Sequence, residues 1–152
     1  MTISELSNTL ASALQEWAGE YGGKAIIAQG PAHVVELLAA KPGAPLVAVA
    51  FDGDSPSDTD ETGLLRRRFK VILSFPRTLK IRRGDALAGD GAEAGAFDLV
   101  EEAREVIRQL PLEADSGESR ASWRGTAVYQ VGDLLFDAWE HSFEISSLVP
   151  LA

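Results

Sequence analysis

The chain contains no cysteine, which excludes disulfides, thiolate catalysis and zinc sites built on cysteine. It has only two histidines, His33 and His141, and it contains neither a G-x-S-x-G nucleophile elbow nor a G-x-x-x-x-G-K-S/T phosphate loop. No apolar run approaches the roughly 20 residues that span a bilayer. The N-terminus lacks the basic and apolar regions of a signal peptide. These absences predict a soluble protein without a catalytic motif, made and kept in a cytoplasm.

The length and composition favour one folded domain. The chain has 152 residues, of which 45% are hydrophobic and 24% are charged. These values suit a single buried core. Neither an internal repeat nor a linker divides the sequence, so residues 1–152 are expected to form one domain.

Hydrophobic periodicity predicts a mixture of helices and strands. Apolar residues recur at helical spacing in three segments, 3–18, 31–40 and 97–110. Strand patterns occupy 24–28, 45–51, 65–75, 121–131 and 134–145, and the last of these is expected to be bent or bulged. The polar or Gly/Ala-rich stretches 52–63 and 85–95 are predicted to be loops. This order predicts an α+β fold, with a mostly antiparallel sheet of four to five strands and the helices packed on one face.

Positive charge is concentrated in one segment. Eight of the fourteen Lys and Arg residues, six of them Arg, lie between Arg66 and Arg83, and this stretch contains no acid. The acidic remainder leaves a net charge of −9. Such a chain repels phosphate as a whole, so general nucleic-acid binding is disfavoured. A segregated basic segment is better suited to oppositely charged protein surfaces, including those of another copy.

The basic segment begins within an expected strand, where apolar and basic residues alternate. The apolar positions are Phe69, Val71, Leu73 and Phe75. The alternation therefore places Arg66, Arg68 and Lys70 together on the other face of the strand. Three interpretations remain open for them: a solvated strand face, a subunit interface that meets acidic segments, or a surface that contacts phosphate. Clustered arginine favours bidentate pairing with carboxylates, and hence protein partners.

The expected loop at 52–63 gathers five carboxylates. They are Asp52, Asp54, Asp58, Asp60 and Glu61. Its D-x-D start is similar to an EF-hand calcium loop, but Ser57 replaces the required glycine and the final Glu is missing. A solvated loop is therefore expected here, with no metal site and no cofactor. The two histidines are likewise expected to be ordinary surface or half-buried residues.

The order of these segments resembles the tail terminator or tail completion proteins of long-tailed bacteriophages, including the Mu-like group. Four pieces carry the resemblance over nearly the whole chain. They are the N-terminal helix, the strand pair PLVAVAF and RRRFKVILSF around a loop, the helix FDLVEEAREVIRQL after a Gly/Ala loop, and the closing hairpin WRGTAVYQVGDLLFDAWEHSFEI. The Leu99 to Leu110 part of that helix is the most family-like piece.

The resemblance implies a non-enzymatic structural protein of the virion tail, assembled in the host cytoplasm. Its copies would form a ring, commonly a homo-hexamer, that caps the finished tail tube, ends polymerisation and meets the head-tail connector protein. Nucleic acid would pass at most transiently through the lumen.

Within that picture, the basic and acidic segments have expected roles. Arg66, Arg68 and Lys70 are expected to form a subunit or tail interface, and Arg82 and Arg83 to lie on a loop that meets another ring or the lumen. The acidic loop that begins at Asp52 is expected to order on binding the tube or the connector. Two alternatives stay open: a small metal-dependent hydrolase that uses this loop, and an adaptor of a contractile injection system.

Overall fold

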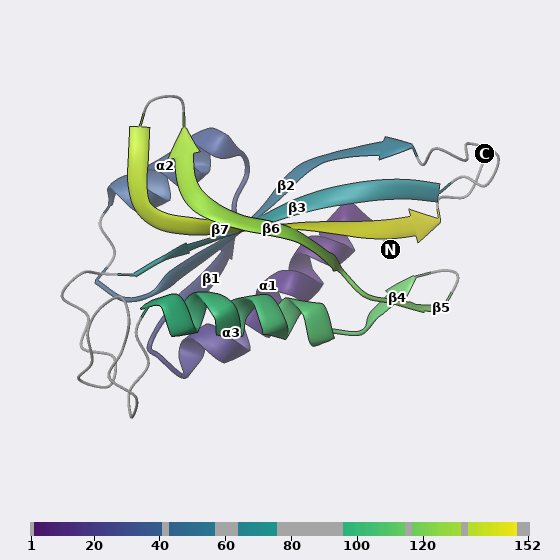
Figure 1. The fold of residues 1–152 in the computed structure, drawn as a ribbon, viewed down its shortest axis with the longest axis horizontal. Coiled ribbons are helices and arrows are strands. Elements are labelled where there is room, and N and C mark those ends of the chain that lie inside the picture. The colour runs from purple at the N-terminus through teal and green to yellow at the C-terminus, as the bar shows by residue number, and fades with distance from the viewer. Residues whose placement is uncertain are drawn as a thin grey trace.

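The computed structural model describes residues 2–40, 43–56, 64–75, 96–114, 117–131 and 134–148. The elements are α1 (Ile3–Gly19), β1 (Lys24–Ile27), α2 (Pro31–Ala39), β2 (Leu46–Pro56), β3 (Leu64–Ser74), α3 (Ala96–Gln109), β4 (Leu112–Ala114), β5 (Gly117–Ser119), β6 (Ser122–Val131) and β7 (Leu134–Leu148) (Figure 1). The predicted α+β class is confirmed, and each predicted helix and strand has a counterpart. The short β4–β5 hairpin is additional. No helix within the described ranges is long and apolar enough to cross a bilayer.

Five strands form the main sheet, in the order β1-β2-β3-β7-β6. β1 runs parallel to β2, and the other neighbours are antiparallel. Helix α2 is the crossover between the two parallel strands, a connection that a tight hairpin cannot make. The last strand in sequence, β7, lies between β3 and β6, so β6 is at one edge of the sheet.

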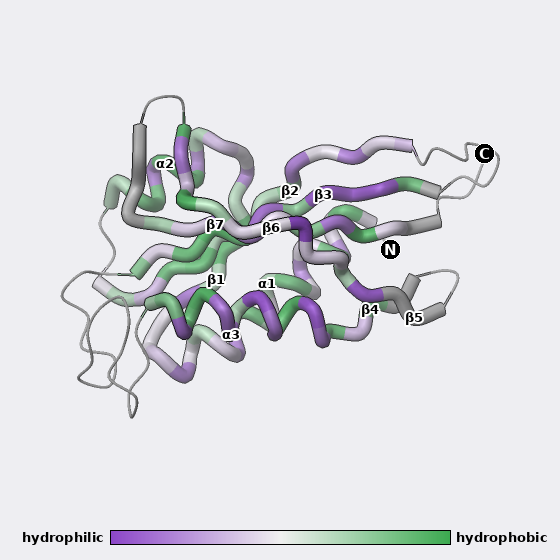
Figure 2. Tube along the Cα trace, viewed as in Figure 1, coloured by the Kyte–Doolittle hydropathy of each residue, from purple (hydrophilic) through white to green (hydrophobic). Residues whose placement is uncertain are grey.

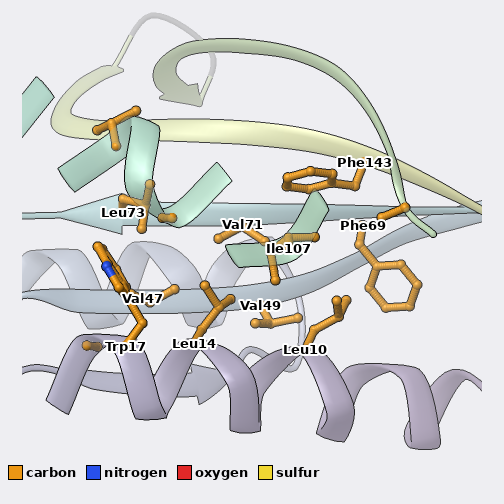
Figure 3. Packing of buried hydrophobic residues seen from close by; sticks show 14 of the residues in the cluster. Leu10, Leu14, Trp17, Val47, Val49, Phe69, Val71, Leu73, Ile107 and Phe143 are labelled. Atoms are coloured by element: carbon orange, nitrogen blue, oxygen red, sulfur yellow. The ribbon is translucent and has the colours of Figure 1, made fainter. Parts of the chain in front are cut away.

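The two long helices cover one face of the sheet and bury the main core. Thr2 caps α1, because its Oγ1 accepts a hydrogen bond from the backbone N–H of Glu5 at 3.1 Å. In Figure 3, Leu10, Leu14 and Trp17 of α1 lie against the sheet residues. The fully or largely buried partners from the strands and α3 include Val47, Val49, Phe69, Val71, Leu73, Ile107 and Phe143. The core therefore follows from the alternation along β2 and β3 and the apolar stripes of α1 and α3.

The short helix α2 packs against the opposite face, which differs from the expectation that all helices share one face. Val34 of α2 joins a second buried cluster with Ala48 of β2, Ile72 of β3 and Tyr129 of β6. Strands β2 and β3 carry apolar residues on both faces in this region, and such strands are covered from both sides. The apolar run in β2 is therefore covered by α1 on one face of the sheet and by α2 on the other.

Strand β2 is longer than the sequence pattern predicts. The predicted strand ends at Phe51, but β2 continues to Pro56. Its register with β3 shifts between Phe51 and Asp54, and pairing then resumes with Ser55 opposite Arg66. The expectation of a loop directly after Phe51 is therefore wrong. Pairing with β3 across this bulge outweighs the weak strand propensity of Asp, Gly and Pro.

The expectation of an irregular final strand is confirmed. The register between β6 and β7 shifts between Trp123 and Gly125 and again between Val128 and Gln130. Figure 1 shows β7 curving sharply away from the sheet near its start. Bulges bend the strands in which they occur and increase the local twist.

Candidate functional site

The basic residues of β3 share one face of the sheet, as the alternation predicts. Phe69, Val71 and Leu73 are fully buried beneath α1 and α3, and the residues between them point to the other side. Figure 2 shows the hydrophilic stretch of β3 in the half of the sheet away from α2. The half of this face that α2 leaves uncovered therefore carries charge.

Strand β7 supplies carboxylates to this face. Glu144 lies 3.9 Å from Arg66 (Oε1 to Nε) and 3.1 Å from Arg124 of β6 (Oε1 to Nη2). Glu140 Oε2 lies 3.5 Å from Lys70 Nζ. Both glutamate side chains are only 17% exposed, against 39% for Arg66, 34% for Lys70 and 58% for Arg124. The carboxylates lie lower in the surface, and the cations project above them.

Arg68 is the most exposed of the basic residues on this face of β3. It is exposed, and its Nη1 donates a hydrogen bond to Ser55 Oγ at 3.2 Å. Its guanidinium lies over the β2 bulge, because a Cβ added at Gly53 would meet Nη2 at 3.2 Å. Gly53 has φ 101°, a conformation that favours glycine, and its missing side chain leaves room for the Arg68 guanidinium.

We call Arg66, Arg68, Lys70 and Arg124, with Glu140 and Glu144 between them, the basic face. Its four cations against two carboxylates leave it positive. Sequence reasoning missed Arg124, Glu140 and Glu144, which lie far from the basic segment. The alternation of Glu140, Ser142 and Glu144 along one strand face was the available signal.

The opposite side of the molecule is acidic. Helix α1 contains Glu5 and Glu16 and no Lys or Arg, and α3 contains four acids against two Arg. The acids of α3 are Asp98, Glu101, Glu102 and Glu105. Several of them line a shallow open groove of about 500 Å³ along α3, which Trp17 also borders. We call the outer surface of α1 and α3 the acidic face.

Local contacts hold some of these acids in place. Glu105 Oε1 is 2.9 Å from Arg108 and 3.1 Å from Arg104. The hydrogen bond from Arg108 lowers the pKa of Glu105, against a smaller effect of desolvation, and Arg104 adds to the lowering. Glu102 accepts a hydrogen bond from the Tyr21 hydroxyl at 2.8 Å. These contacts hold the carboxylates of Glu102 and Glu105 in fixed positions on the acidic face.

The acidic segment differs from the predicted partner-binding loop. Asp52 and Asp54 are exposed residues of β2. Asp58, Asp60 and Glu61 lie outside the described residues, as do Arg82 and Arg83 and the predicted loop 85–95. Within the described ranges, no three His, Cys, Asp or Glu side chains come together in a way that could hold a metal ion.

His141 is more deeply placed than the sequence predicts. It was expected at the surface or half-buried, but it is 1% exposed between β7 and α3. Its Nε2 is 2.7 Å from the Val100 carbonyl oxygen, and its Nδ1 is 2.7 Å from Thr126 Oγ1. Because a carbonyl only accepts, Nε2 carries the proton and Nδ1 accepts from the threonine hydroxyl. Burial lowers the pKa of His141. The hydrogen bond to Val100 raises this pKa by a smaller amount, and the positive charge of Arg104 lowers it further.

His33 has a local structural contact. Its Nδ1 accepts a hydrogen bond from the backbone N–H of Gln29 at 3.0 Å, just before α2. The ring thereby satisfies a backbone donor at the turn that leads into the helix.

Comparison with known proteins adds no family to this description: no protein-family model matches the chain, and no curated protein matches its sequence. The candidate site is therefore defined by its own geometry. It consists of two extended, oppositely charged surfaces on either side of one sheet. Surfaces of this kind recognise charged partners over a broad area.

Proposed function

We propose that this chain is a structural protein of virion assembly, whose copies form a ring that caps a completed phage tail tube. The ring ends polymerisation of the tube and presents a surface to the head-tail connector. The assignment to a tail comes from the resemblance in the order of elements. The structure supports the proposal through the surface charges.

The observation that carries the proposal is the separation of charge onto opposite sides of one sheet. The basic face lies on one side, and the acidic face of α1 and α3 lies on the other. A ring subunit in a tail contacts different components through different surfaces, and heterologous contacts need two complementary patches. Two faces of opposite charge meet that requirement within one small domain.

Arg68 has the leading role at the basic face. Arg66 and Arg124 already share Glu144, and Lys70 pairs with Glu140, so part of their charge is neutralised within the chain. Arg68 instead contacts a neutral hydroxyl. It therefore presents its charge to an acidic component of the assembly, either the next copy or the tail tube.

The solution mass of the protein tests the proposal. Light scattering after gel filtration, at low and at high salt, should detect a species near six times the chain mass of 16.2 kDa at low salt. Salt should weaken it, because exposed charges are screened. Negative-stain microscopy should show closed rings. A monomer at every salt and protein concentration would refute spontaneous ring formation.

A matched pair of variants separates the basic face from net charge. Arg68→Glu and Lys24→Glu change the total charge equally, but Lys24 is an exposed residue of β1 that belongs to neither charged face. Arg68→Glu should reduce the ring-sized fraction at low salt, whereas Lys24→Glu should leave it largely intact. Equal loss in both variants would show that total charge, and not the basic face, controls assembly.

A further inference from the structure

Strand β6 is an edge strand that is exposed along most of its length. Seven of its ten positions are exposed, whereas β2 begins with four buried residues in succession. Trp123 is 39% exposed and Val128 is 53% exposed. Within the described ranges, β6 pairs only with β7, and no further backbone hydrogen bond engages its outer edge. An edge of this kind is a template for another strand.

The exposed tryptophan on this edge is held in place before any partner arrives. Trp123 Nε1 donates to Thr126 Oγ1 at 3.2 Å, and the guanidinium of Arg104 lies 4.8 Å from the centre of the indole ring. Thr126 in turn bonds His141, which is anchored to α3. Pre-ordered side chains lose little entropy when they bind, which favours a contact surface.

The β6 edge is also basic. The segment Ser122–Val131 contains Arg124 and no acid, and the exposed Arg120 precedes it. Arg104 adds a third cation beside Trp123. The partner that fits this edge is an extended segment that combines acidic and apolar residues.

The opposite edge of the same sheet combines acidic and apolar residues. β1 pairs with β2 only over Leu46–Val49, so the rest of β2 has one strand neighbour, β3, within the described ranges. This end of β2 carries Phe51, which is 38% exposed, and the exposed Asp52 and Asp54. It contains no Lys or Arg.

We infer that the β6 edge of one copy pairs with the free end of β2 in the next copy, so that the sheet continues from subunit to subunit. The inference rests on the proposed function and names the surfaces through which neighbouring copies meet. Backbone hydrogen bonds across the two edges supply the contact, and Phe51 meets the apolar side chains of β6. The bulge and Pro56 keep the paired stretch short.

Charge favours the pairing of β6 with β2 over the two symmetric alternatives, which are β6 with β6 and β2 with β2. Two β6 edges would bring Arg120 and Arg124 of both copies together, and two β2 ends would oppose Asp52 and Asp54. Like charges directly opposite one another are destabilising, and opposite charges are stabilising. Pairing of β6 with β2 is head-to-tail, which is the kind of contact that forms a ring when the rotation between successive copies closes.

Cysteine cross-linking tests the inference directly, because the natural chain contains no cysteine. Ala127 lies opposite Glu140, and Ser55 lies opposite Arg66, so both positions are on the side of the sheet that carries the basic face. A mixture of Ala127→Cys and Ser55→Cys chains is oxidised, and the mixed disulfide is quantified by mass spectrometry. In the control mixture, Ser55→Cys is replaced by Ser12→Cys, an exposed position on α1.

The Ala127 and Ser55 pair should cross-link on the order of tenfold faster than the control pair, because pairing raises the local thiol concentration. Arg124→Glu in the first chain should slow the reaction, and Asp52→Arg in the second should restore it. Equal rates for the two mixtures, or slowing without restoration, would overturn the inference.

Failure of this inference can be distinguished from failure of the proposed function. Ring-sized particles without the cross-link would mean that the copies meet through other surfaces, and only the inference would fail. The cross-link without ring-sized particles would establish contact between the two edges while refuting ring closure.

Discussion

Protonation of His141 should destabilise the fold in mildly acidic solution. The imidazole is buried, its Nε2 donates to the Val100 carbonyl, and its Nδ1 accepts from Thr126. Burial holds the pKa of His141 below its ordinary value of 6.5, and the nearby Arg104 acts in the same direction. Protonation would place a charge next to a guanidinium in a region with little water.

The direction and size of the effect follow from proton linkage. Because the folded pKa is lowered, the unfolded chain binds more protons than the folded chain as the pH falls below about 6.5. The contribution of neutral His141 to the free energy of unfolding is therefore fully present above that value. It decreases as the pH falls towards the pKa of His141 in the folded chain, and below that pKa the loss levels off. The slope for one such group approaches about 1.4 kcal/mol per pH unit within that window.

Urea unfolding, followed by the fluorescence of the three tryptophans, measures the slope at intervals between about pH 7 and about pH 5. His141→Gln should lower the stability at neutral pH and flatten the slope, because the amide retains a donor for Val100 but does not titrate. His33→Gln keeps the buried histidine and should keep the slope. Identical slopes in the wild type and in His141→Gln would refute this account.

Three further changes test the core, the bulge and the basic face. Leu14→Ala, at a fully buried position of α1, should cost about 2–5 kcal/mol in urea unfolding. Gly53→Ala should lower the thermal midpoint because φ is 101° and the new Cβ would meet Arg68, whereas Gly43→Ala, with open space around it, should have a smaller effect. Glu144→Gln should change stability by only about 1 kcal/mol, yet it should lower the salt needed for elution from an anion exchanger, because a chain of net charge −9 then loses one negative charge.

The sequence was sufficient to predict the elements whose hydrophobic pattern is strong and local. The stripes of α1 and α3 and the alternation along β3 each identify a buried face without knowledge of the neighbours. For the same reason, the grouping of Arg66, Arg68 and Lys70 on one face was predictable. The prediction required only the period of a strand.

The features that were missed depend on pairing between distant segments. The end of β2 has the composition of a loop and is a strand because β3 continues alongside it. Glu144 becomes a partner of Arg66 only because β7 inserts next to β3, a neighbour that sequence order does not indicate. The burial of His141 likewise depends on the position at which α3 crosses the sheet. Local propensity carries no information about such contacts.

The central position of β7 has a consequence for synthesis of the chain on the ribosome. β3 and β6 are both complete before β7 emerges, yet each must pair with it, and Phe143 and Ile145 supply part of the main core. The nascent chain therefore exposes unpaired strand edges until residue 148 has left the exit tunnel. Contacts of long sequence separation form slowly, and exposed edges favour aggregation. Yield in the cell should thus depend on protection of the nascent chain, for instance by chaperones, during the last stage of translation.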